Sequence, residues 1–340
     1  MSRQRSTPFF DADLRDGVAA ALEDCMQKTK NMDARAMQEA HWRLAADMGW
    51  LGAMVTEEQG GLELGRAFAA DLCAEAGRAL FCGPLLETAI LLPALAAECS
   101  SLLPLLNGVV AGDVRLGLAE ECSGQVLVQY ADAATHIAVL NCSTDTLSVT
   151  FAPSTAFRCV MLQPLDPRSS VACAELIDPD VAEHIPLQRE AADRVLHALY
   201  MAQAADLWGI AEAALLATVS YVVERRQFGR PIGQFQGVKH RLADIHTAVD
   251  AARLAIATTV DDAAGAHEAA IARILACDAA LAASGAAIQY HGGLGFSWEA
   301  DLHLYLKRAL RLNASTGGTA ALRSTVGERI IMRALEADAA

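Results

Sequence analysis

Aromatic residues are scarce in this sequence of 340 residues: they make up 5% of it, although hydrophobic residues make up 53%. Alanine and leucine supply much of the apolar content, and with few aromatics they favour helix over sheet. A chain of this length can form two or three cores of ordinary domain size. We therefore expect a mainly helical protein.

Positive charge is also in short supply, because the formal net charge at pH 7 is −14. Non-specific nucleic-acid binding depends on Lys and Arg that neutralise phosphates, so we expect no nucleic-acid partner. The stretch RRQFGRPIGQFQ (225–236) is an exception, since it has three Arg and no acid. It predicts a local site for a small phosphorylated ligand in an otherwise acidic protein.

The sequence lacks the residue spacings of common metal sites and disulfide frameworks. Its nine His are scattered, and no HExxH pattern occurs. Its Cys residues form no CxxC pair and stand at positions 25, 73, 82, 99, 122, 142, 159, 173 and 277. We expect them to be small buried hydrophobic residues in a reducing cytosol, and we expect no metal site.

A signal peptide and a long membrane span are missing too. The first residues, MSRQRSTPFFDADLRD, do not contain the apolar core of a signal peptide. The most apolar run, LLETAILLPALAA (85–97), contains Glu87 and Pro93 and is too short to cross a bilayer. These features predict a soluble, cytoplasmic protein.

Three zones of different character follow one another along the chain. Residues 1–105 include two segments with apolar residues at helical spacing, at 34–50 and 66–80. Residues 106–186 contain runs rich in Val, Thr and aromatics with turn residues between them, which predict four to six short strands. Residues 187–340 are again typical of helices. We take these zones as three domains.

The third zone predicts an antiparallel bundle of long helices. Residues 190–226 form one candidate helix with hardly any breaker except Gly209. In the next helix, apolar residues recur at alternating steps of four and three, at Val238, Leu242, Ile245, Val249, Ala252 and Ile256. Further helices are expected over about 266–290, over about 298–312 and after the GGT at 317–319. Long helices joined by short connections favour a bundle.

Two loops of this zone have an unusual composition. In the loop at 225–236, Gly229 and Pro231 explain the break between helices, and the arginines fit two interpretations. They are surface charges at a helix C-terminus, or they are bidentate phosphate ligands. In IQYHGGLGF (288–296), the glycines end a helix and also let backbone amides approach an anionic group, and Gln289 offers a donor and an acceptor. Neither loop alone fixes a function.

Together and in this order, the loops resemble a known family. SYVVERRQFGRPIGQFQGVKHRLADI (220–245), followed by QYHGGLGFSWEADLHLYLKRA (289–309), is similar to the acyl-CoA dehydrogenase family, as is WLGAMVTEEQGGLELG (50–65). The resemblance covers most of the chain and is weakest in the middle. It implies a mainly α fold with an N-terminal helical domain (1–105), a small, reduced β-domain (106–186) and a C-terminal antiparallel bundle (187–340).

The resemblance implies an FAD enzyme that oxidises an acyl-CoA thioester to the 2-enoyl-CoA. A base removes the proton next to the carbonyl while the β-hydride passes to the flavin, and the protein supplies placement and the base. An electron-transferring flavoprotein is then the expected electron acceptor.

The resemblance also implies which residues bind the cofactor. The motif positions in the first loop are Arg225, Phe228 and Gln236, and those in the second loop are Gln289, Gly292 and Gly293. In the family these residues reach across a subunit interface. There they bind the ADP half of a flavin held mainly by the neighbouring subunit.

The sequence departs from the family where the chemistry takes place. The family base is a Glu at one of two positions, and this chain has Leu199 at one and Thr316 or Gly317 at the other. A TEPxxGSD-like segment of the β-domain, which contacts the flavin ring and substrate, is reduced to AEECSGQV (119–126). The retained motifs are those that serve a partner's flavin.

Three functions are compatible with this pattern. The first is a subunit that does not catalyse alone but completes the flavin site of a second acyl-CoA dehydrogenase subunit in a heterotetramer, as in bacterial steroid side-chain breakdown. The second is an active homo-oligomer with a relocated base, for which the candidates are Glu299, Asp301, Glu212 and Asp206. These acids are also explained as helix N-terminal, solvent-facing or paired groups. The third is a repurposed flavoprotein.

Overall fold

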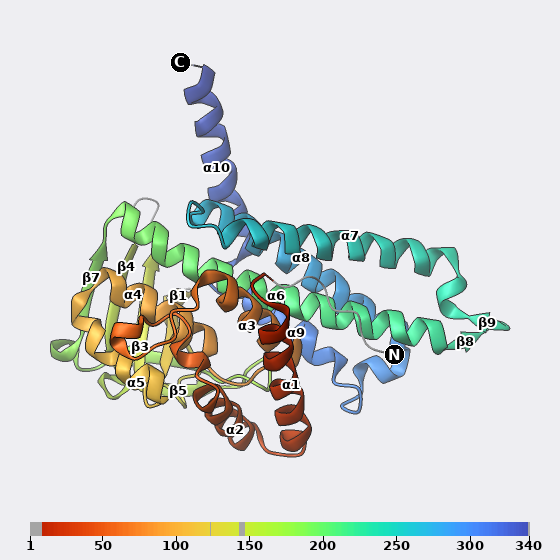
Figure 1. The fold of residues 1–340 in the computed structure, drawn as a ribbon, viewed down its shortest axis with the longest axis horizontal. Coiled ribbons are helices and arrows are strands. Elements are labelled where there is room, and N and C mark those ends of the chain that lie inside the picture. The colour runs from red at the N-terminus through yellow and green to blue at the C-terminus, as the bar shows by residue number, and fades with distance from the viewer. Residues whose placement is uncertain (1–8, 123, 143–146, 339–340) are drawn as a thin grey trace.

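The computed structural model describes residues 9–122, 124–142 and 147–338. Helices come first, then strands, then helices again (Figure 1). The helices before the sheet are α1 (Ala12–Thr29), α2 (Ala34–Asp47), α3 (Gly65–Ala79), α4 (Leu92–Glu98) and α5 (Leu106–Ala111). A π-helical turn, Glu87–Leu91, leads into α4. The prediction of a mainly α fold with a small β part and a helical C-terminal half is confirmed.

The middle of the chain forms one sheet in the order β5-β6-β2-β1-β3-β4-β7. Its strands are β1 (Leu116–Cys122), β2 (Gln125–Gln129), β3 (His136–Cys142), β4 (Leu147–Pro153), β5 (Phe157–Leu162), β6 (Val171–Leu176) and β7 (Glu183–Leu187). β1 and β3 are parallel, and the other neighbours are antiparallel. The prediction of four to six strands was wrong, because the sheet has seven. The edge strand β7 has Pro186 and charged or polar residues, which are tolerated at an edge but hide its strand character.

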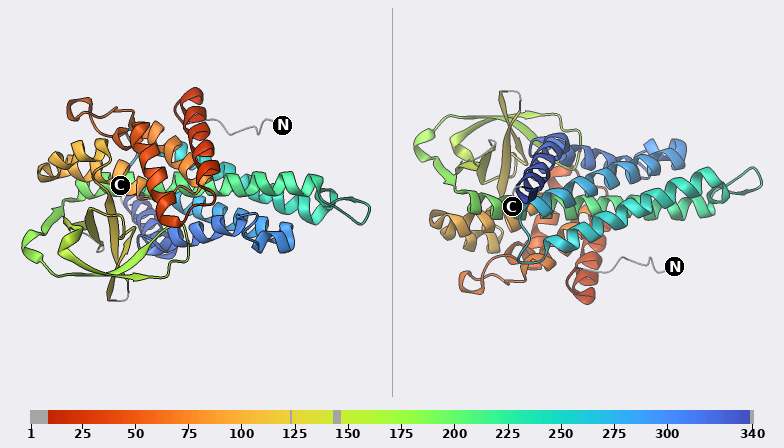
Figure 2. Two further views of the ribbon diagram at one scale, coloured as in Figure 1. Left: turned by 90° about the horizontal axis from the view of Figure 1, so that it is seen from below. Right: turned by 90° about the horizontal axis from the view of Figure 1, so that it is seen from above.

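The second helical part is an elongated bundle. It consists of α6 (Arg189–Glu224), α7 (Gln236–Thr259), α8 (Ala266–His291), α9 (Leu302–Ala314) and α10 (Gly318–Asp338). Figures 1 and 2 show α6, α7 and α8 running along the long axis, with the sheet at one end and a small hairpin at the other. The hairpin consists of β8 (Arg226–Gln227) and β9 (Arg230–Pro231), which the sequence did not predict.

Helical periodicity in the sequence identified the packed face of α7. Ile245, Val249, Ala252 and Ile256 are all buried, as the spacing predicts. α6 and α8 show no single apolar face, since both are buried on most sides. Ala-rich surfaces let α6 and α8 pack closely. On another side of α6, Gly209 permits close contact with α3, because a Cβ there would lie 1.9 Å from the carbonyl oxygen of Ala74.

Two helical segments have the length and hydropathy of a membrane span, Arg189–Glu224 and Ala266–Phe296. Within the most apolar window of each, 67% and 61% of the residues are buried inside the protein. Their apolar character is therefore explained by their place at the centre of the bundle.

One hydrophobic core runs through all three parts of the chain. It includes Leu72 of α3, Val149 of β4 and Leu207 of α6. A smaller cluster, with Val128, lies on the opposite face of the sheet, as expected for strands whose side chains alternate between faces. The domain boundaries inferred from the sequence stay a prediction.

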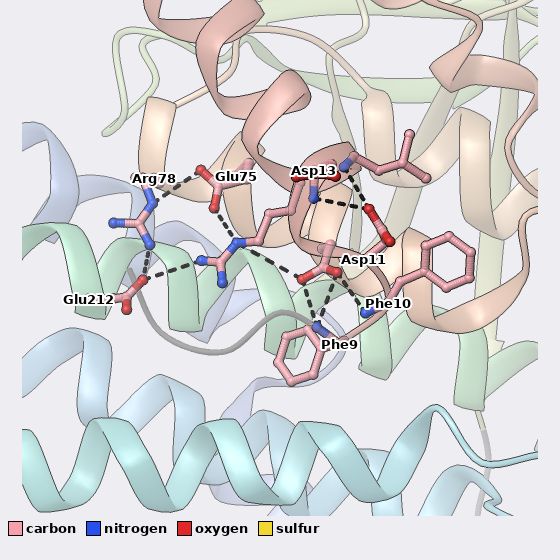
Figure 3. Close-up of polar contacts among 10 residues, drawn as sticks. Phe9, Phe10, Asp11, Asp13, Glu75, Arg78 and Glu212 are labelled. Carbon is pink, nitrogen blue, oxygen red and sulfur yellow. Dashed lines mark hydrogen bonds and ion pairs between the residues drawn. The ribbon is translucent and has the colours of Figure 1, made fainter. Parts of the chain in front are cut away.

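Buried charges connect the N-terminal helices to the bundle (Figure 3). Arg15 on α1 contacts Glu75 on α3 at 2.7 Å and Glu212 on α6 at 3.6 Å. Arg78 pairs with the same two carboxylates. Asp71 accepts hydrogen bonds from the backbone N–H groups of Phe9 and Phe10. Because the ions are paired on several sides, the cost of burying them is offset.

Candidate functional site

The two predicted ligand loops begin at neighbouring helix ends. The rings of Tyr221, near the end of α6, and His291, at the end of α8, stack with centroids 4.0 Å apart. Arg225 follows the first of these helices, and Gly292 follows the second. The structure thus brings the two motifs to the same end of the bundle, away from the sheet (Figure 1).

The first loop folds as the β8–β9 hairpin with Phe228 and Gly229 at its tip. Both have positive φ, 50° and 80°, which suits the two-residue turns that follow the twist of paired strands. For a phenylalanine this conformation costs energy, and the side chain gains little from burial because it is 91% exposed. Its ring contacts Phe235 edge to face. Strained backbone of this kind occurs most often at functional sites.

The hairpin and the start of α7 form a basic surface. Between 225 and 243 the sequence has five Lys or Arg and no acid, in a chain of net charge −14. Arg225, Arg226 and Arg230 are exposed. In the described part of the chain, none of them forms an ion pair with a carboxylate, although Arg230 lies over the ring of Phe235. Guanidinium groups left free in this way suit a phosphate ligand.

The second loop offers open space next to an exposed amide. Gln289 is exposed, and Gly292 ends α8 with φ 59°. At Gly292 and Gly293 a Cβ would meet no heavy atom of the described residues within 4 Å, whereas at Gly295 it would lie 2.5 Å from the carbonyl oxygen of Ile288. Packing therefore explains Gly295, while the first two glycines leave their backbone accessible to a ligand.

A groove of about 240 Å³ lies between α7 and α8 beside this loop. Gln289 lines it, together with Arg241, Leu281, Ala282, Gly285, Ala286 and Tyr290. Of the six predicted cofactor residues, Gln289 is the one that borders this groove. Gln236 lies exposed at the first position of α7.

The positions expected for a catalytic base are elsewhere, near the sheet. Leu199 is buried in α6, 2% exposed. Thr316 and Gly317, between α9 and α10, and Gly318, the first residue of α10, have positive φ of 52°, 74° and 81°. The Thr316 hydroxyl donates to the side-chain oxygen of Gln203 on α6 at 3.3 Å. These contacts leave a hydroxyl and a glycine where a carboxylate would be needed.

Two charged residues at this loop were missed in the sequence. Glu120 of β1 accepts a hydrogen bond from the Gly317 N–H at 3.3 Å, and Arg273 of α8 donates to the carbonyl oxygens of Leu312 and Ser315. Burial raises the pKa of the Glu120 carboxyl, although the N–H groups of Thr316 and Gly317 lower it. The signal was the Glu retained in AEECSGQV, but nothing local tells which distant segment it meets.

The four acids considered as relocated bases have other partners or surroundings. Asp301, just before α9, pairs with Arg168 at 3.1 Å, and Glu299 is exposed. Glu212 belongs to the buried cluster of Figure 3. Asp206 is buried, and burial raises its pKa.

Asp206 borders a small cavity of about 10 Å³, enough for about one water molecule. Glu87, Tyr130, Arg308 and Arg311 also line it. Burial raises the pKa of Glu87 to about 6 and that of Tyr130 to about 12. The cavity is too small to admit a thioester.

No metal site is apparent in the ranges that the structure covers. No group of three His, Cys, Asp or Glu is placed there to hold an ion. Eight cysteines are free thiols, and the side chain of Cys142 lies outside the described part of the structure. Cys73, Cys82 and Cys277 are buried, as predicted, whereas Cys122 is exposed.

Comparison with known proteins decides the family. A family model for the acyl-CoA dehydrogenase N-terminal domain matches residues 11–101, and one for the C-terminal domain matches residues 190–331. Acyl-CoA dehydrogenase IpdE2 of Mycobacterium tuberculosis is 33% identical over 292 residues, 81% of each chain. The chain belongs to the acyl-CoA dehydrogenase family. The unmatched middle coincides with the sheet, where the resemblance in the sequence was weakest.

Solved structures show that this chain has the family fold over nearly its whole length. A structure described as the Tcur3481-Tcur3483 steroid ACAD G363A variant superposes with a TM-score of 0.82 and 25% identity, covering 95% of this chain and 98% of that one. A chain of the ChsE4-ChsE5 complex from Mycobacterium tuberculosis superposes with a TM-score of 0.76 and 20% identity, covering 96% and 99%.

Proposed function

We propose that this chain is a non-catalytic subunit of a heteromeric acyl-CoA dehydrogenase and completes the flavin site of a second, longer subunit. One contrast carries the proposal. The predicted ADP-binding residues are exposed at the end of the bundle that includes the basic segment 225–243, while the base positions have Leu199, Thr316 or Gly317. Two structural neighbours, Tcur3481-Tcur3483 and the ChsE4-ChsE5 complex, each combine two proteins, which supports a heteromer. For this chain we propose a heterotetramer.

The residues at the bundle end fit the ADP half of FAD, the cofactor of this family. Arg225 offers unpaired donors for a phosphate, and Gln289 offers an amide for the adenosine part. Gly292 and Gly293 allow close approach, because no described atom lies where their Cβ would be. Phe228 and Gln236 complete the set from the other loop. When bound, FAD supplies the hydride-accepting chemistry, and these residues hold and orient it.

The substrate class follows from the family and from one neighbour. An acyl-CoA thioester is the substrate of the complex, and a steroid or similarly bulky acyl group is proposed from the neighbour described as a steroid ACAD. The partner subunit supplies the base, and an electron-transferring flavoprotein accepts the electrons. We propose a cytoplasmic location for the complex.

A visible spectrum of the purified chain tests this function. We expect colourless protein alone and yellow protein after co-expression with a longer dehydrogenase from a neighbouring gene. Flavin bound to the chain alone, and bleached by an acyl-CoA, would overturn the proposal.

Arg225→Ala tests the interface residues in the complex. Loss of hydrogen bonds to a charged phosphate should weaken flavin retention by roughly tenfold to a hundredfold. Arg158→Ala is the control, since Arg158 is exposed on the sheet and pairs with Glu175. Equal retention in both variants would remove Arg225 from the site.

The second candidate is an active homo-oligomer with a relocated carboxylate. The observation that favours it is the Glu120 carboxylate, which lies against Gly317, one of the expected base positions. In that case the chain alone would oxidise an acyl-CoA, and Glu120→Gln would abolish the reaction.

A further inference from the structure

The loop after α9 is held by side chains from three separate elements. Gln203 of α6 accepts from the Thr316 hydroxyl at 3.3 Å, and its amide nitrogen lies 3.4 Å from the Ser315 hydroxyl. Arg273 of α8 donates to the Ser315 carbonyl at 2.6 Å and to the Leu312 carbonyl at 3.0 Å. Glu120 of β1 accepts from the Gly317 N–H. Contacts from α6, α8 and β1 therefore hold four residues, Leu312, Ser315, Thr316 and Gly317.

Arg273 holds the loop although its own burial is unfavourable. It is fully buried, 0% exposed, and lies over the ring of Tyr200. Its Nε and Nη1 have no hydrogen-bond partner among the described residues. Burying a guanidinium with unsatisfied N–H groups costs free energy. The two hydrogen bonds to the loop carbonyls offset part of that cost.

The loop itself has a conformation that needs holding. Three successive residues, Thr316 to Gly318, have positive φ. For Thr316, a β-branched residue, this is a strained region of backbone space. Such a turn persists where surrounding contacts fix it, and Gln203, Arg273 and Glu120 provide them.

β1 and this loop are in direct contact. Proton abstraction with hydride transfer requires a substrate between two groups, each at about 3–3.5 Å from the reacting atoms. Here Glu120 and the Gly317 nitrogen are joined directly at 3.3 Å. A group that enters between these two atoms would first have to break this hydrogen bond.

We propose that Glu120 and Arg273 lock residues 315–318 against β1, so that this chain's own half of the assembly is closed to flavin and thioester. The inference rests on the proposed function and extends it: the inactive half is blocked by its packing, and restoring a base alone does not activate it. Glu120 acts here as a positioning residue for the loop.

Hydrogen exchange in the chain alone tests the lock without any partner. In Glu120→Ala, the amides of residues 316–318 should exchange roughly tenfold faster or more, since they lose a charge-assisted hydrogen bond. Glu121→Ala is the matched control on the same strand, because Glu121 is exposed and should leave these amides unchanged. If Glu120→Ala is unstable, Glu120→Gln gives the same comparison with the side chain's size retained. Unchanged exchange in the Glu120 variants would overturn the lock.

Restoring a base in the complex tests the closed half. With Glu120 in place, Thr316→Glu and Gly317→Glu should leave the flavin content per complex and the rate of acyl-CoA oxidation unchanged. A rise in flavin content in either variant would show that the half-site is open and overturn the inference. The inference would also be overturned if the chain alone oxidised an acyl-CoA and Glu120→Gln abolished that activity. Glu120 would then be a base. The proposed function has a separate readout, the colour of the chain alone, so the two can fail independently.

Discussion

At the residue scale, Glu87 is buried in a π-helical turn beside Asp206 and Arg311. Burial raises its pKa from 4.5 to about 6, against the opposing effect of Arg311. Because the folded pKa lies above the unfolded one, the group's favourable contribution is complete below about pH 4.5 and is lost as the pH rises through about 6.

Glu87→Gln should therefore stabilise the protein at pH 7.5 and change little at pH 4.5. The shift corresponds to a gain of about 2 kcal/mol in the free energy of unfolding at the higher pH. Urea unfolding at the two pH values measures it, with the exposed Glu57→Gln as control. A gain of the same size at both pH values would contradict the assignment to ionisation.

Single residues also show where sequence reasoning ends. Arg225 and Gln289 stand in contiguous motifs, so their exposure at one end could be anticipated. Glu120 and Arg273 could not be, because their roles depend on contacts with a loop that follows Glu120 by nearly 200 residues. Burial and pairing over such distances are tertiary facts, which no local pattern encodes.

At the element scale, the β8–β9 hairpin has an exposed Phe228 at its tip in a backbone conformation that is unfavourable for phenylalanine. Asn tolerates positive φ better than Phe does, so Phe228→Asn should leave the thermal stability of the chain alone unchanged or slightly raised. It should weaken assembly with the partner subunit and flavin retention. Calorimetry of the chain and sedimentation of the complex measure the two effects. A destabilised chain with normal assembly would make Phe228 a packing residue.

Two helical glycines offer a matched pair. Gly209 lies where α6 crosses α3, and an added Cβ would overlap the Ala74 carbonyl oxygen, so Gly209→Ala should cost about 1–3 kcal/mol or more. Gly285 of α8 faces open space, and Gly285→Ala should gain up to about 1 kcal/mol from helix propensity. Chemical unfolding of both variants checks the signs. Similar effects in both would contradict the close α3–α6 contact.

Helices were predicted more reliably than strands for a physical reason. The period of apolar residues in α7 persists over 24 residues, and a helix of that length leaves a clear pattern. β1 has no β-branched residue, and β7 lies at the sheet's edge with Pro186. Their strand state depends on neighbours in the sheet more than on their own composition.

At the scale of the whole molecule, one buried ion group joins the three parts of the chain. Asp166, between β5 and β6, accepts from Arg308 of α9 at 2.5 Å. The Nη2 of Arg308 also donates to the carbonyl oxygen of Phe81, in the N-terminal part. Burial opposes ionisation of Asp166, but Arg308 and Arg311 hold its pKa below the usual value. The ion pair therefore fixes sheet, bundle and N-terminal helices in one arrangement.

Removing both partners of this group should cost less than the sum of the two single removals. Asp166→Asn leaves the buried Arg308 without its carboxylate and should cost about 3–5 kcal/mol. Arg308→Met should cost a similar amount, whereas the double variant should cost clearly less than the sum of the two. Urea unfolding of the four proteins, followed by tryptophan fluorescence and by circular dichroism, measures this coupling. Additive costs would mean that the pair does not act as one unit, and the link between the three parts would then rest on the apolar core.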